Sequence, residues 1–172
     1  MTRTGYRATQ FVQALLAQPA AEDARLVADY LPPALRPRFD GMSRAEQSHS
    51  LSVLRTLLRQ GQTDPDLLAA ALLHDVGKTR APLRLLDRVL VVLAQRVAPG
   101  AAQAWSNGAP RGWKRPFVVA ARHTEWGAEI LEQAGASPRL VGLVRQHHAS
   151  FPPCGAEVDR MLVALQTADG SH

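Results

Sequence analysis

The chain has 172 residues, which is enough for one domain and few for two. Hydrophobic residues make up 46% without any low-complexity run, which argues against disorder, and the single cysteine, Cys154, excludes an internal disulfide or a cysteine-based zinc cluster. The net charge of +5 would attract anionic substrates, but the basic residues are scattered, so we expect no dedicated nucleic-acid surface.

The first part of the chain predicts helices with clear start and stop signals. Tyr6–Leu31 is expected to form two short helices. A capping box at Ser43–Glu46 and a glycine at Gly61 bracket one long helix. A further helix over residues 65–73 has a polar cap and a proline at its start and is apolar throughout. Gly77 is expected to end it.

The second part predicts four more helices and two loops. Pro82 is expected to open a helix that ends at Pro99-Gly100. Its apolar residues recur at three- and four-residue steps: Leu83, Leu86, Leu90, Leu93 and Val97. Residues 105–116 hold two glycines, two prolines and two tryptophans and are expected to form a loop. The remaining helices are expected from after Pro116 to Ala134, from Ser137-Pro138 to the histidines at 147 and 148, and over 157–168, with a loop at 151–155.

No segment shows the alternation of a β-strand, since Val89–Leu93 lies inside a helical period. We therefore expect an all-α fold: a single-domain helical bundle over 43–172, with residues 1–42 as an N-terminal helical extension packed on it. Met1–Gln10 lacks the apolar core of a secretory signal, and the most apolar stretch, Val89–Ala94, is far shorter than the about 20 residues of a membrane span. A cytoplasmic protein is expected.

The segment Leu72–Lys78 carries the clearest chemical signal. An apolar helix delivers His74 and Asp75 side by side, and Lys78 follows the glycine. Burying an unpaired carboxylate there would cost several kcal/mol, and a bound cation would remove that cost. A carboxylate can bridge two cations while an imidazole binds one, so this pair predicts a metal site. The alternative is a hydrogen bond between the two side chains within the core.

His49 precedes this pair on an earlier helix, and Asp169 follows it on the last one. This order, over about 120 residues, resembles the HD superfamily of metal-dependent phosphohydrolases, whose signature is a histidine, a His-Asp doublet and a distant aspartate. The doublet with Gly77-Lys78 looks like the family's His-Asp-Ile-Gly-Lys variant. The resemblance covers residues 45–170 and implies that His49, His74, Asp75 and Asp169 hold a metal ion.

Three further histidines extend the resemblance. His123, followed by Glu125 and Gly127-Ala128, looks like the extra histidine of binuclear members, and His147-His148 resembles their final histidine or histidine pair. The implied arrangement has two metals about 3.5–4 Å apart bridged by Asp75, with His123 and His147 on the second. In a mononuclear enzyme His123 would contact substrate instead. His148 is either a further ligand or a contact to substrate or to a bridging water.

The implied reaction is hydrolysis of a phosphate ester by metal-activated water, with Asp75, Lys78 and His148 as the catalytic residues. Lys78 would steady a non-bridging oxygen, although a solvated cation at a helix end is the alternative. Mixed imidazole and carboxylate ligation suits one or two divalent ions of manganese, iron, nickel, cobalt or zinc, with magnesium as a further candidate.

The resemblance favours a small-molecule phosphate substrate, with a nucleotide as the first expectation, and leaves monoester, diester and pyrophosphate cleavage open. Residues 149–153 replace the Gly-Tyr-Pro element of the cyclic-di-GMP phosphodiesterases, which argues against that substrate. The competing hypotheses are a non-catalytic, metal- or nucleotide-binding regulatory domain and a nucleic-acid-binding helical module. A nucleic-acid-binding module would need a concentrated basic face, which the sequence does not show. The sequence leaves the oligomeric state open.

Overall fold

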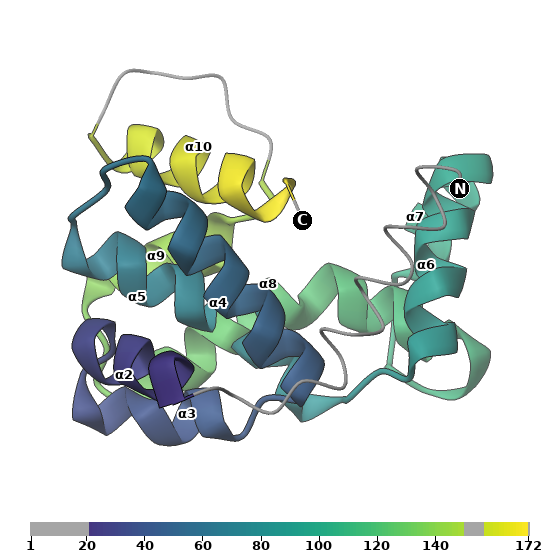
Figure 1. Ribbon diagram of the computed structural model, residues 1–172. Helices are drawn as coiled ribbons and strands as arrows, with labels where there is room; N and C mark the ends of the chain where they lie inside the picture. Colours follow the sequence, from purple (N-terminus) through teal and green to yellow (C-terminus); the bar gives the residue numbers. More distant parts are fainter. Residues whose placement is uncertain (1–20, 150–156, 172) are drawn as a thin grey trace, which may run out of the picture.

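The computed structural model describes residues 21–149 and 157–171, so the first N-terminal helix expected within 6–31 and the loop expected at 151–155 lie mostly or wholly outside the described residues. Every regular element in those two ranges is a helix, which confirms the expected all-α class (Figure 1). The elements are α2 (Ala21–Tyr30), η1 (Pro33–Leu35), α3 (Arg36–Asp40), α4 (Arg44–Arg59), α5 (Pro65–Leu73), η2 (Val76–Arg80), α6 (Leu85–Val97), α7 (Pro99–Trp105), η3 (Gly112–Lys114), α8 (Arg115–Gln133), α9 (Pro138–Gln146) and α10 (Glu157–Asp169).

The expected helix caps are present. The Ser43 hydroxyl accepts from the backbone N–H of Glu46, and the Glu46 carboxylate accepts from the backbone N–H of Ser43 at 3.0 Å, which completes the capping box of α4. Gly61 follows α4 with a φ of 75°. Asp64 accepts from two backbone N–H groups in the first turn of α5, and the Ser137 hydroxyl accepts from one in α9. These local signals fix where three of the site-bearing helices begin.

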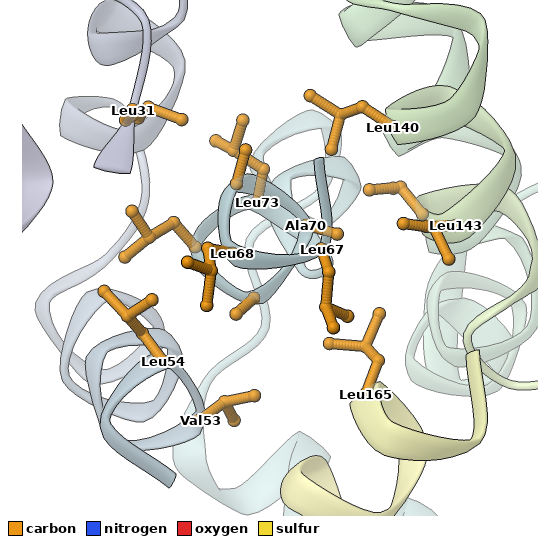
Figure 2. Close-up of a cluster of buried hydrophobic side chains, with 14 of the residues drawn as sticks. Leu31, Val53, Leu54, Leu67, Leu68, Ala70, Leu73, Leu140, Leu143 and Leu165 are labelled. Atoms are coloured by element: carbon orange, nitrogen blue, oxygen red, sulfur yellow. The ribbon is translucent and has the colours of Figure 1, made fainter. Parts of the chain in front are cut away.

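Helix α5 lies at the centre of the bundle. All of its residues from Leu67 to Leu73 are buried, as expected for a helix that is apolar on every side. Figure 2 shows α5 surrounded by side chains of α4, α9 and α10, among them Val53, Leu143 and Leu165. The residues that follow Leu73 therefore emerge inside the protein, and these are His74 and Asp75.

The described part of the N-terminal region shares this core. Helix α2 packs against α5, and apolar side chains from residues 21–42 belong to the same buried cluster: Val27, Leu31, Leu35, Phe39 and Met42. The short helices η1 and α3 were not expected from the sequence. Pro33 and Pro37 occupy the first turns of these helices, where the missing N–H of proline is tolerated.

Two expected helix boundaries are wrong. Gly77 does not end α5, because the helix stops at Leu73 and the chain tightens into the 3-10 helix η2, which contains Gly77. Pro82 does not open the next helix, because α6 begins at Leu85 with Arg84 as its N-cap. That helix ends at Val97, as expected from Pro99-Gly100, and Pro99 then begins a further helix that was not expected, α7, where proline lies in the first turn. The expected loop at 105–116 contains the short helix η3.

Helices α6 and α7 pack against each other and stand to one side of the bundle, joined to it through α8 (Figure 1). A small second cluster of buried side chains, Val91, Ala102 and Phe117, connects the three helices. None of the helices in the described residues is long and apolar enough to cross a membrane.

Candidate metal centre

Five stretches of chain deliver the predicted side chains to one place. His49 comes from the middle of α4, and His123 comes from the middle of α8. The other residues follow helix ends: His74-Asp75 after α5, His147-His148 after α9, and Asp169 as the last residue of α10. Their side chains form two groups of donors with one carboxylate between them.

The first group consists of His49, His74 and Asp169, whose donor atoms all lie within 4.8 Å of one another. Nε2 of His49 lies 2.7 Å from Oδ1 of Asp169, and Nε2 of His74 lies 3.6 Å from the same oxygen. Two imidazole nitrogens and a carboxylate oxygen at this separation form a donor set that a single divalent ion could hold.

The second group consists of His123, His147 and His148, whose donor nitrogens also lie within 4.8 Å of one another. The ring centroids are 5.4 Å apart for His123 and His147, 5.1 Å for His123 and His148, and 4.3 Å for His147 and His148. His148 is exposed whereas His123 and His147 are buried. The second group therefore offers three nitrogen donors and reaches solvent through His148.

Asp75 lies between the two groups. Its Oδ2 is 3.7 Å from Nε2 of His74, and its Oδ1 is 3.5 Å from Nε2 of His123. Each oxygen of this one carboxylate therefore faces a different group, as a residue that bridges two ions requires. Lys78 places Nζ 2.5 Å from Oδ2 of Asp75, and its side chain is 23% exposed.

Three buried histidines are held so that one ring nitrogen points into the centre. Nδ1 of His74 lies 3.0 Å from the carbonyl oxygen of Ala71, and His123 and His147 make the equivalent contact, at 2.9 and 2.7 Å, with the carbonyl three residues earlier. A carbonyl can only accept, so each Nδ1 carries the proton and each Nε2 carries a lone pair.

Those three Nε2 atoms are buried and have no hydrogen-bond partner within the part of the chain described here. Such unpaired buried acceptors are costly. Histidine metal ligands are typically oriented in this way, with the second nitrogen donating to a carbonyl or carboxylate. The donor set therefore fits a centre for one or two divalent ions.

Burial and charge hold these groups in the protonation states that bind metal. Burial lowers the pKa of His74 and lowers that of His147 well below its ordinary value, and it lowers the pKa of His123 to about 4. Burial alone would raise the pKa of Asp75, but the neighbouring histidines and Lys78 hold it well below its usual range. Near pH 7 the centre thus combines neutral imidazoles with an ionised carboxylate.

Asp169 is also ionised at neutral pH. Burial would raise its pKa, but the hydrogen bond from His49 and the proximity of His74 lower it to about 2. The side chains of His49 and Asp169 are 31% and 20% exposed, in contrast to the buried His74 beside them. The centre therefore has a buried floor and a rim that solvent and a substrate can reach.

The backbones of η2 and α8 approach each other closely beside the centre, and the sequence did not reveal this contact. A Cβ added to Gly77 would lie 1.9 Å from the carbonyl oxygen of His123 and 2.6 Å from the backbone nitrogen of Gly127. Helix η2 can approach α8 this closely only because residue 77 has no side chain. Asp75, directly before η2, lies beside His123 of α8. The only signal in the sequence is Gly77 itself, two residues after the His-Asp pair, and a glycine at that place predicts a helix end rather than a close contact.

The sequence model of the HD domain family matches residues 47–169. This span runs from the first turn of α4 to the end of α10 and contains every residue of both donor groups. No curated protein and no solved structure matches the chain.

Proposed function

The chain belongs to the HD domain family of metal-dependent phosphohydrolases, and we propose that it hydrolyses a phosphate ester of a nucleotide or a related small molecule. The observation that carries this proposal is the set of three buried histidines whose Nε2 atoms point into the centre without a partner among the described residues. HD domains bind divalent metals, and these nitrogens, together with the ionised Asp75, form a donor set for them.

The two donor groups suggest how the ions would be held. The first ion would take His49, His74 and Asp169, and the second His123 and His147, with Asp75 shared. Bound ions of this kind lower the pKa of a coordinated water and neutralise the charge that develops on the phosphoryl oxygens. Imidazole with carboxylate suits manganese, iron, nickel, cobalt or zinc, and magnesium remains a further candidate.

Two side chains on the solvent side of the centre would act on the substrate. The Lys78 ammonium is held beside Asp75 and is partly exposed, so it would contact a non-bridging phosphoryl oxygen. His148 is exposed and lies against His147, so it would reach the substrate and move a proton to the leaving oxygen. Positive charge and a proton source are what phosphate ester cleavage requires from the protein.

The test combines metal content with turnover. The purified protein would be assayed for bound metals and against a panel of nucleotide monoesters, diesters and pyrophosphates, with the nucleotide and nucleoside products separated by chromatography as the readout. Asp75→Asn keeps the shape of the side chain and removes its charge, so we expect turnover to fall by at least about 1,000-fold. Asp29→Asn, which alters an exposed carboxylate on α2, should retain wild-type activity.

Turnover that survives in Asp75→Asn would contradict the assignment. Metal bound at one or two equivalents without turnover of any phosphate ester would instead favour the regulatory alternative, in which the same side chains hold a structural ion. The two measurements separate these outcomes, because metal content shows whether the donor set binds ions and turnover shows whether the protein hydrolyses a phosphate ester.

A further inference from the structure

Helix α6 turns its apolar side toward solvent. Six of its large apolar side chains are between 45% and 82% exposed: Leu86, Val89, Leu90, Val92, Leu93 and Val97. The periodicity that predicted this helix therefore does not mark a face buried in the bundle. Together these side chains expose on the order of 600 Å², which is the upper end of the largest apolar patch on a typical monomer.

The opposite side of α6 packs against the rest of the protein. Val91 is buried against Ala102 and Phe117. Arg88 lies 2.7 Å from Oε1 of the buried Glu46 in the first turn of α4. This anchored side is narrow and partly polar, and the apolar side of α6 is exposed among the residues that the structure describes.

Four of the exposed residues form a continuous line, which we call the α6 seam: Leu86, Leu90, Leu93 and Val97. Their spacing of four, three and four residues matches the a and d positions of a coiled coil. At about 100° per residue they fall within about 60° of one another and about 130° from Val91. The line spans roughly 17 Å, which is nearly the whole helix.

The α6 seam is complementary to itself. Its midpoint lies between Leu90 and Leu93, so an antiparallel copy related by a two-fold axis would place Leu90 against Leu93 and Leu86 against Val97. Each apolar side chain would then meet an apolar partner. Leucine at successive heptad positions is typical of such helix pairs.

We propose that the α6 seam is covered by the α6 helix of a second copy of this chain, in an antiparallel pair about a two-fold axis. Covering the four seam side chains on both copies would bury roughly 900 Å² of apolar surface, which is at the low end of protein interfaces, where weak and transient contacts lie. The dimer should therefore form with a micromolar dissociation constant rather than a nanomolar one.

The N-terminal segment of the same chain fits the α6 seam less well. Its large apolar residues that a helix could group on one side are Phe11, Val12, Leu15 and Leu16. As a helix they would span roughly 8 Å, about half the length of the seam. A second copy matches the full length, which is why we assign the surface to self-association.

Sedimentation velocity on the full chain, at concentrations from about 1 to about 200 µM, tests the proposal. We expect the wild type to change from monomer to dimer over this range. Leu90→Glu should raise the dissociation constant by at least about 100-fold, because the charge would be buried in the pair. Gln95→Glu introduces the same charge at an exposed position of α6 outside the seam and should dimerise as the wild type does.

Disulfide cross-linking tests the same proposal if the Leu90→Glu variant does not fold. Leu90→Cys and Leu93→Cys would be made separately in a Cys154→Ser background and then mixed under oxidising conditions. An antiparallel pair predicts that the mixture gives more disulfide-linked dimer than either variant alone. Equal cross-linking in all three samples would overturn the geometry.

Three results would overturn the proposal itself. One is a wild type that stays monomeric at the highest concentration. Another is a dimer that Leu90→Glu leaves intact. The third is a wild-type monomer that dimerises only after residues 1–18 are removed, which would assign the surface to the N-terminal segment of the same chain.

Discussion

The metal-free protein should lose stability as the pH falls from about 6.5 to about 4, with His123 as one measurable cause. Burial lowers the pKa of His123 to about 4, from an ordinary value of 6.5. Between these values the unfolded chain binds a proton that the folded chain does not, so the free energy of unfolding falls as the pH falls. The full shift corresponds to about 3 kcal/mol, most of which is lost by pH 4.5.

That loss is large against the 5–15 kcal/mol by which a typical domain is stable. His74 and His147 shift in the same direction, so the total slope should be steeper than one histidine provides. Asp169 does not interfere, because its folded pKa of about 2 confines its contribution to the range below its ordinary 3.8. Its stabilisation is present above pH 3.8 and is lost only as the pH falls toward 2.

Urea unfolding of the chelator-treated protein at several pH values between 7 and 4.5 would measure the effect. His123→Gln replaces the ring by a polar side chain that does not titrate in this range. We expect the loss of unfolding free energy between pH 7 and pH 4.5 to be smaller in this variant by about 2 kcal/mol. If wild type and variant show the same pH dependence, His123 is not held neutral by burial and the electrostatic account of the centre fails.

Three further predictions follow from the contacts. Chelation should lower the melting temperature, and a divalent ion added back at about 100 times its dissociation constant should restore about 2.7 kcal/mol, measured by calorimetry. Gly77→Ala should destabilise the protein by at least about 3 kcal/mol in urea unfolding, because its Cβ would meet backbone atoms of α8, whereas Gly142→Ala, with nothing within 4 Å, should be neutral or stabilising. Arg88→Ala should cost about 2–3 kcal/mol in the same assay because it leaves the buried Glu46 carboxylate without its cation, while Arg96→Ala at an exposed position should have little effect. Equal melting with and without metal, or equal stability of either variant and its control, would contradict the corresponding argument.

The parts of the fold that the sequence predicted well are those that local chemistry determines. Ser43, Asp64 and Ser137 begin helices because each side chain accepts from backbone N–H groups that a helix start leaves unpaired. The all-α class followed from the same signals. The HD resemblance named side chains that the structure brings together, because it compares order and spacing along the chain, and the family match over 47–169 supports that resemblance.

Other features depend on packing and could not be predicted from local sequence. The periodicity predicted that α6 has an apolar side but not the direction in which that side faces. The direction depends on the contacts of Arg88 with Glu46 and of Val91 with Ala102 and Phe117. The role of Gly77 depends on a neighbour 50 residues away, Gly127, whose backbone it touches. The two Asp75 oxygens face separate histidine groups because η2 packs on α8, a neighbour that is distant in the sequence.

The convergence of helix ends explains why this location favours cations in a protein with a net charge of +5. Helices α5, α9 and α10 all end at the centre, and the C-terminus of each carries roughly half a negative charge from its unpaired carbonyls. The ionised Asp75 and Asp169 add to that negative charge. Among the described residues, Lys78 is the one lysine or arginine that forms an ion pair with either carboxylate, and it contacts only Asp75. Since the buried histidines stay neutral near pH 7, the remaining negative charge is best compensated by metal ions at their Nε2 atoms.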